Sequence, residues 1–171
     1  MKSITILIVG LVLALAAISP APVRAGETQT PAVSLTCTSG SATLTDRYDD
    51  ALRSPAIHTK TILATSDASG NVTACAVPAI YGVLVGWEIV PSSGDAQPTT
   101  LFDITLVKAS GADILGGRGT NVANTSYVEG WTSITDASGN VMPIPLGGGL
   151  TLTGSAIGAA NSFTVRLYVR I

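Results

Sequence analysis

The stretch Gly94–Val107, GDAQPTTLFDITLV, decides the fold class of this chain together with Gly111–Gly119, GADILGGRG. In Phe102–Leu106, apolar residues alternate with an aspartate and a threonine after a polar turn. Alternation with a period of two is typical of a β-strand with one buried face. The second stretch predicts a glycine turn, a short strand over Ala112–Leu115 and a sharp bend at the closing glycines.

Strand patterns recur along the rest of the chain at spacings of about ten residues, as in antiparallel β-sandwiches. Ser162–Ile171 alternates most regularly, with Phe163, Val165, Leu167 and Val169 predicted to face inward. Gly147–Gly149 is predicted to be a flexible turn. The chain is therefore predicted to be all-β, with a single antiparallel β-sandwich or jelly-roll-like domain. The other expected strands are His58–Thr65, Val72–Val77, Ile80–Pro91, Thr100–Lys108, Tyr127–Thr135 and Leu150–Gly154.

The first 25 residues are predicted to be a secretory signal peptide. Ile4–Ile18 is an apolar run followed by a helix-breaking proline, and Val23 and Ala25 are small residues before a cleavage site. An uncleaved membrane anchor and an internal structural helix are the alternatives. Residues 26–55 are predicted to be a lead-in segment with one first short strand, in which Asp46–Arg53 forms a turn or short helix. Residues 56–171 form the expected sandwich domain.

The charge balance excludes one class of partner. The chain has nine basic and 11 acidic residues, a net charge of −2, and no basic cluster. Nucleic-acid binding needs a stripe of lysines and arginines along the phosphate backbone, so no nucleic-acid partner is expected. No later apolar segment has the length of a membrane span, so no stable span is expected after signal cleavage. The expected location is periplasmic or extracellular.

Cys37 and Cys75 are the two cysteines of the chain. An even number of cysteines behind an export signal favours one disulfide, which would contribute roughly 4 kcal/mol in the chain-entropy model. Two buried free thiols are the alternative. Two cysteines and the single His58 are too few for a familiar metal site.

Candidates for catalysis are few, and the chain is expected not to be an enzyme. His58 is predicted to lie at the surface near a strand start, and no Gly-x-Ser-x-Gly motif accompanies it. Gly111–Gly119 lacks the Lys-Ser/Thr of a phosphate-binding loop, so no cofactor is expected. The acidic residues that could have formed a catalytic pair, Asp49, Asp50, Asp103 and Asp113, are predicted to be structural.

One short repeat has two interpretations. The sequence Asp67–Val72, DASGNV, recurs as Asp136–Val141. Its residues are strong turn formers, which predicts two hairpin turns. A calcium site is the alternative, since side-chain oxygens alternate, but no bidentate acid follows either copy.

Partner contacts are expected at Trp87, Trp131, Gln97 and Arg118, and in two long polar loops, Pro91–Thr100 and Arg118–Tyr127. Two solvent-facing tryptophans on one sheet would favour a sugar-binding platform. Burial of both would count against it.

Residues 59–171 resemble a group of small tailed-bacteriophage virion-associated or minor structural proteins. The resemblance rests on Phe102–Leu106, on Gly111–Gly117 with Asn121, and on the ending Val165–Arg170. It implies a non-enzymatic structural or surface-attachment protein, virion-associated in those relatives, that self-associates or docks on a protein partner. An exported module that binds carbohydrate, such as a cell-surface glycan, is the second hypothesis, and a small secreted hydrolase is the third.

Overall fold

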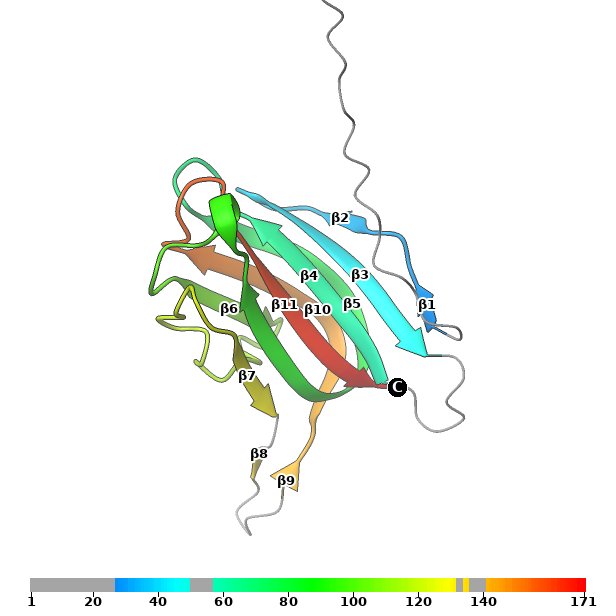
Figure 1. Cartoon of the computed structure of the whole chain (residues 1–171). Coiled ribbons are helices and arrows are strands. Elements are labelled where there is room, and N and C mark those ends of the chain that lie inside the picture. Colours follow the sequence, from blue (N-terminus) through cyan, green and yellow to red (C-terminus); the bar gives the residue numbers. More distant parts are fainter. Residues whose placement is uncertain (1–26, 50–56, 132–133, 136–140) are drawn as a thin grey trace, which may run out of the picture.

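The computed structural model describes residues 27–49, 57–131, 134–135 and 141–171. Within these ranges the chain forms strands, one short 3₁₀ helix, η1 (Gly94–Ala96), and no α-helix (Figure 1). The prediction of an all-β, antiparallel fold is confirmed. The predicted signal segment lies outside the described residues. The strands are β1 (Glu27–Gln29), β2 (Val33–Leu35), β3 (Ser41–Asp49), β4 (Ile57–Thr65), β5 (Val72–Pro91), β6 (Asp103–Lys108), β7 (Val128–Trp131), β8 (Ile134–Thr135), β9 (Val141–Met142), β10 (Ile144–Ser155) and β11 (Ser162–Arg170).

Nine strands form one sheet in the order β1-β3-β4-β11-β5-β10-β6, with β2 added on β3 and β7 added on β5. The remaining two strands, β8 and β9, pair only with each other. The 20-residue strand β5 pairs with three other strands of this sheet. Its first part pairs with β10, and its last part pairs with β11 on one edge and with β7 on the other.

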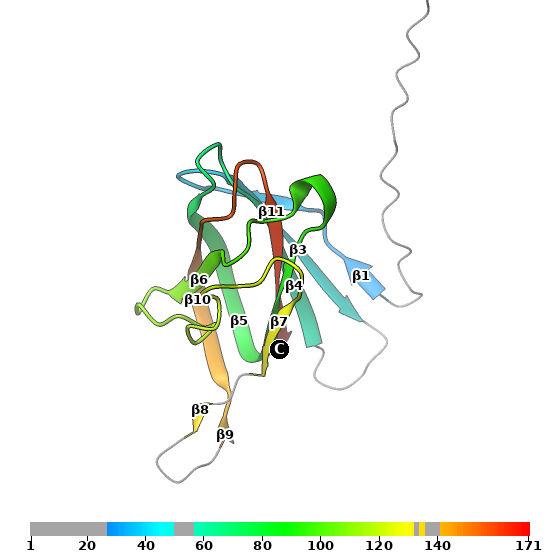
Figure 2. The same ribbon diagram turned by 60° about the vertical axis from the view of Figure 1, so that its left-hand side comes forward.

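The sheet curves into two layers that face each other across the core. In Figure 2, β6 and β10 lie to the left, while β11, β4 and β3 lie to the right. Side chains of the two layers meet between them: the rings of Phe102 and Phe163 are 6.0 Å apart. Both rings are fully buried. Because β5 pairs with β10 along one half and with β11 along the other, it belongs to both layers, which makes the fold sandwich-like.

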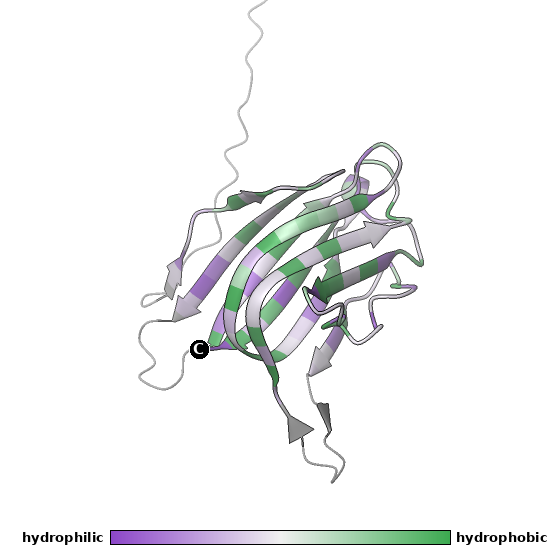
Figure 3. Ribbon diagram, turned by 180° about the vertical axis from the view of Figure 1, so that it is seen from behind, coloured by the Kyte–Doolittle hydropathy of each residue, from purple (hydrophilic) through white to green (hydrophobic). Residues whose placement is uncertain are grey.

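The alternation predicted for β11 is confirmed. Phe163, Val165, Leu167 and Val169 are all fully buried, and the residues between them are partly or well exposed. Figure 3 shows the same alternation of hydrophobic and hydrophilic residues along the strands. Burial of each large apolar side chain contributes about 1.5–3 kcal/mol, so this strand is a main source of stability.

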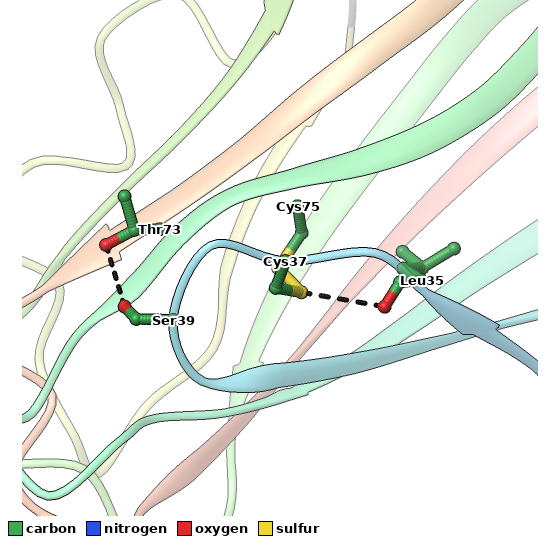
Figure 4. The surroundings of a disulfide bond; sticks show 5 residues. All are labelled: Leu35, Cys37, Ser39, Thr73 and Cys75. Carbon is green, nitrogen blue, oxygen red and sulfur yellow. Dashed lines mark hydrogen bonds between the residues drawn. A yellow bond between two sulfur atoms is a disulfide. The ribbon is translucent and has the colours of Figure 1, made fainter.

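A disulfide between Cys37 and Cys75 joins the outer edge of one layer to the first half of β5 (Figure 4). Backbone bridges pair Thr36 with Ala76 and Ser39 with Thr73 on either side of it. The hydroxyl groups of Ser39 and Thr73 also form a hydrogen bond of 2.9 Å. The predicted pairing of the cysteines is therefore present, and it closes the gap between the two layers.

The region before residue 56 differs from the prediction. Its described part, residues 27–49, contains three strands rather than one, and all three belong to the main sheet. Asp46–Asp49, expected in a turn or short helix, lies in β3, which pairs with β4 from Ser41 to Arg47. The predicted lead-in is wrong because threonines and short polar residues in this region tolerate a strand that is half exposed.

Three other local predictions are wrong. Val72–Val77 and Ile80–Pro91 form the single strand β5, because Pro78 sits at an irregularity opposite Gly149, where its missing N–H costs no ladder bond. Gly147–Gly149 lies within β10 rather than in a turn. Ala112–Leu115 is not a strand but a series of turns with one bridge, between Asp113 and Val107.

Candidate functional site

A cleft opens at the place where β7 and β10 part along a shared edge of β5. On that edge Trp131 of β7 is paired with Gly86, and Ile144 of β10 is paired with Leu84. The cleft has a volume of about 400 Å³, within the range of roughly 300–1,000 Å³ typical of small-ligand sites. Its lining consists of Trp87, Lys108, Ala112, Asp113, Ile114, Leu115, Gly116, Arg118, Gly130, Trp131, Ile144 and Pro145.

The two tryptophans lie on opposite faces of the sheet, and both line the cleft. Trp87 is 3% exposed and Trp131 is 73% exposed. Each ring packs on a glycine of the neighbouring strand: a Cβ on Gly130 would lie 2.5 Å from the Trp87 ring, and a Cβ on Gly86 would lie 3.1 Å from the Trp131 ring. Gly130 therefore makes room for the buried indole of Trp87. Gly86 lets the exposed indole of Trp131 pack on the outer face of the sheet. Neither condition set by the sequence, both tryptophans exposed or both buried, is met.

Two cationic side chains, Arg118 and Lys108, line the cleft. The Arg118 guanidinium lies 5.9 Å from the centre of the Trp87 ring, a cation–π distance. The side chain is exposed. No carboxylate in the described part of the chain forms a salt bridge with it. The Lys108 ammonium donates a hydrogen bond of 3.0 Å to the carbonyl of Pro145 across the cleft.

Asp113 holds the loop that carries Arg118. Its Oδ1 accepts hydrogen bonds from the backbone N–H groups of Leu106 and Leu115, both at 3.1 Å, and its Oδ2 accepts one from Gly117 at 3.0 Å. Gly116 and Gly117 have φ angles of 63° and 76°, which glycine adopts without strain. The glycine-rich segment is thus a fixed loop around a carboxylate, and the structural role expected for Asp113 is observed.

Replacing Asp113 with asparagine is expected to lower the free energy of unfolding by about 1–3 kcal/mol, because an amide NH₂ would face backbone donors that a carboxylate oxygen now satisfies. Urea unfolding of the variant measures this loss. Asp95→Asn is the matched control, since Asp95 is exposed and its replacement is expected to change stability by less than about 0.5 kcal/mol. Equal losses in the two variants would contradict the role given to Asp113.

Gln97 lies apart from the cleft, but it joins the two loops predicted for partner contact. Its side-chain amide donates a hydrogen bond of 2.9 Å to the carbonyl of Asn124, and the Asn124 amide donates one of 3.0 Å to the carbonyl of Pro98. These contacts border a shallow hollow of about 290 Å³ that includes Gln97, Asn124 and Tyr127. The structure therefore brings three of the four predicted contact residues together and places Gln97 elsewhere.

His58 is predicted to lie at the surface, but its side chain is only partly exposed and contacts two neighbours. Its Nδ1 lies 3.3 Å from Oδ2 of Asp46, and its ring stacks on Tyr48 with centres 4.8 Å apart. Lys60 forms a salt bridge with the same Asp46 oxygen. The side chains of His58, Asp46 and Lys60 are each 16–19% exposed. The aspartate is thus shared between two cationic or donor groups at the end of the sheet, an arrangement that holds β3 against β4.

The repeat copy at Asp67 forms the expected turn. Oδ1 of Asp67 accepts hydrogen bonds from the backbone N–H groups of Asn71 at 3.0 Å and Ser69 at 2.8 Å. These bonds, that from Asn71 foremost, lower the pKa of the Asp67 carboxyl. The second copy includes residues outside the described part of the chain. No group of three or more His, Cys, Asp or Glu side chains in the described ranges is placed to hold a metal ion.

Charged residues also lie beside Trp131 on the outer face of the sheet. Arg166 forms a salt bridge with Glu88, and Glu129 is the cross-strand partner of Glu88. Partial burial, followed by a hydrogen bond to Glu88, raises the pKa of the Tyr168 hydroxyl. The carboxylate of Glu88 therefore interacts with Arg166 and Tyr168, and Glu88 is not among the residues that line the cleft.

Sequence reasoning missed Lys108 and the two glycines, Gly86 and Gly130, as parts of the site. A usable signal existed for Trp87, since it shares the parity of Ile89 in the alternating strand and so faces inward with it. Nothing in the sequence shows that Gly130 is its partner, because the pair joins residues 43 positions apart that meet only when the strands align.

No protein family, curated protein or solved structure matches this chain. In the described ranges, no helix has the length and apolar character needed to cross a membrane.

Proposed function

We propose that this chain is a non-enzymatic β-sandwich module for structural assembly or surface attachment, which binds its partner through the cleft between β7 and β10. The observation that carries the proposal is the exposed ring of Trp131, which lines the same cleft as the exposed Arg118. Tryptophan and arginine are the residues most enriched at the energetic centres of interfaces. The indole is 73% exposed, a state that a partner surface would relieve.

The sequence adds further support. Its resemblance to small phage virion-associated proteins favours a role as part of, or attached to, a larger particle. The predicted export segment and the disulfide both fit a protein that acts outside the cytosol. The rigid loop around Asp113 fixes Arg118 before binding, which lowers the entropic cost of association.

A carbohydrate-binding module is the second candidate. The observation that favours it is that Trp131 lies against Gly86 and exposes its other side. An exposed ring held in this way is a platform on which a sugar ring can stack. The burial of Trp87 removes the second half of the platform that the sequence suggested, so this candidate depends on Trp131 alone.

Attachment can be measured with the purified protein. Fluorescently labelled chain is mixed with cells of the organism that encodes it, and the bound fraction is measured after pelleting, while light scattering gives the size of the free protein. Trp131→Ala combined with Arg118→Ala is expected to lower binding or self-association about tenfold. Arg170→Ala is the matched control, because it removes an exposed arginine that does not line the cleft. A monomer that binds no cells would contradict the proposal.

A further inference from the structure

We infer that the ligand of this cleft is an acidic saccharide, whose sugar ring stacks on Trp131 while its carboxylate binds Arg118 and Lys108. This inference rests on the proposed attachment function in its second, carbohydrate-binding form, since it names the chemistry that the same cleft would recognise. It follows from three properties of the cleft: its charge, its exposed aromatic ring and its size.

The charge of the cleft is opposite in sign to that of the chain. The chain carries a net charge of −2. The cleft is lined by two cations, Arg118 and Lys108, and by one carboxylate, Asp113. Both oxygens of Asp113 are directed at backbone N–H groups. The charged side chains of the lining that remain available to a ligand are therefore Arg118 and Lys108, and cationic donors bind carboxylates with charge-assisted hydrogen bonds. Glu88 and Glu129 lie beside Trp131 on the outer face of the sheet and do not line the cleft.

The guanidinium of Arg118 is positioned to bind a carboxylate. Its guanidinium lies over the Trp87 ring, so its position is fixed by a cation–π contact rather than by an ion pair within the described chain. A planar guanidinium with exposed N–H groups can bind a carboxylate through two parallel hydrogen bonds. Burial of an arginine against its own carboxylate partner would have removed this capacity.

The remaining walls favour a ring over an extended chain. Trp131, Ile144 and Pro145 are among the apolar residues that line the cleft. The hydrophobic face of a pyranose can lie on the indole, while its hydroxyl groups remain toward water. A volume of about 400 Å³ is at the small end of ligand sites and fits a short saccharide end rather than a folded partner.

Binding of matched acidic and neutral sugars tests the inference. The purified chain is titrated by calorimetry with 3′-sialyllactose against lactose, and with trigalacturonate against galactotriose. The acidic member of at least one pair is expected to bind about tenfold more tightly than its neutral counterpart. This preference is expected to decrease as salt is raised, because the exposed charges are screened.

Variants separate the contributions of ring and charge. Arg118→Ala is expected to remove the preference for the acid, and Trp131→Ala to weaken the acidic and neutral members by about the same factor of ten. Arg170→Ala is expected to leave all affinities unchanged. Equal affinities for acid and neutral sugar, or an Arg118→Ala variant that behaves like Arg170→Ala, would overturn the inference.

Cell attachment separates this inference from the function on which it rests. Attachment that persists while no saccharide binds would overturn the acidic ligand and leave the attachment function standing. Saccharide binding without attachment to cells or self-association would support the ligand and overturn the attachment function. Inhibition of attachment by the acidic sugar, with no effect of the neutral one, would support both.

Discussion

Replacing both Cys37 and Cys75 with alanine is expected to lower the free energy of unfolding by roughly 4 kcal/mol in the chain-entropy model. The cysteines are separated by 38 positions in the sequence, and their crosslink restricts that loop in the unfolded chain. Guanidinium unfolding of the oxidised protein and of the double variant measures the difference. The double variant is also expected to unfold with a larger denaturant dependence, because its unfolded state exposes more surface.

The location of the disulfide explains why its loss also acts on the folded state. It lies between the bridges Thr36–Ala76 and Ser39–Thr73, which join the β2–β3 edge to β5. Cys75 is fully buried among the core residues. Without the crosslink, these backbone bonds and the Ser39–Thr73 hydroxyl hydrogen bond are left to close this side in the described part of the chain. Amide exchange in β2 is therefore expected to accelerate more than exchange in β11.

Two comparisons control this experiment. Wild-type protein unfolded in the presence of a reductant is expected to match the double variant. Ser39→Ala removes only the adjacent hydrogen bond to Thr73 and is expected to cost about 0.5–1.5 kcal/mol. Equal stabilities of the oxidised and reduced protein would show that the crosslink does not constrain the unfolded chain as proposed.

The parts of the fold that the sequence predicts are those with strict alternation. β11 and β6 repeat apolar residues at every second position, and their predicted inward residues are buried in the structure. In these strands the alternation alone determines which side chains face inward, because a shift of the pairing by one residue would turn every apolar side chain to solvent. The turn at Asp67–Asn71 was predictable for a similar reason, since its residues form their own hydrogen bonds.

The parts that escaped prediction are those where long-range pairing overrides local preference. Gly147 and Gly148 belong to β10 because β5 supplies partners for them, Tyr81 and Ile80, while Gly149 lies at the irregularity that follows. Pro78 is accommodated within β5 at an irregularity that only the partner strand creates. Local propensity cannot show such partners, because β-propensity depends on the neighbouring strand.

The candidate site was predictable in its residue types but not in its geometry. Trp87 and Trp131 are contact candidates as the two tryptophans of the chain, and Arg118 as the first residue of a polar loop. All three line one cleft. Their arrangement depends on Gly86 and Gly130, which accept the two indoles on opposite faces of the sheet. A glycine in a strand indicates that another group packs closely against the backbone there. Which side chain this is follows only from the pairing of the strands in the folded structure.

Replacing Phe163 with alanine is expected to lower the free energy of unfolding by about 3–5 kcal/mol, since it removes a fully buried aromatic side chain and leaves a cavity. The ring lies between the layers, 6.0 Å from the ring of Phe102. A Cβ on Gly154 would lie 3.3 Å from the Phe163 ring, so the surrounding backbone is already close and has little room to collapse into the cavity. Chemical unfolding measures the loss, and Phe163→Leu, expected to cost less, serves if the alanine variant does not fold.

Thr164→Ala is the matched control, because the next residue of β11 is partly exposed and points to the other face; its expected cost is below about 1 kcal/mol. A double-mutant cycle with Phe102→Leu then tests whether the layers meet at this ring pair. A coupling of about 0.5–1.5 kcal/mol between Phe102→Leu and Phe163→Leu is expected for aromatic side chains in contact. Additive losses in the cycle, or equal costs for Phe163→Ala and Thr164→Ala, would contradict a core in which the two layers of the sheet meet at this ring pair, because rings that are not in contact would not be coupled.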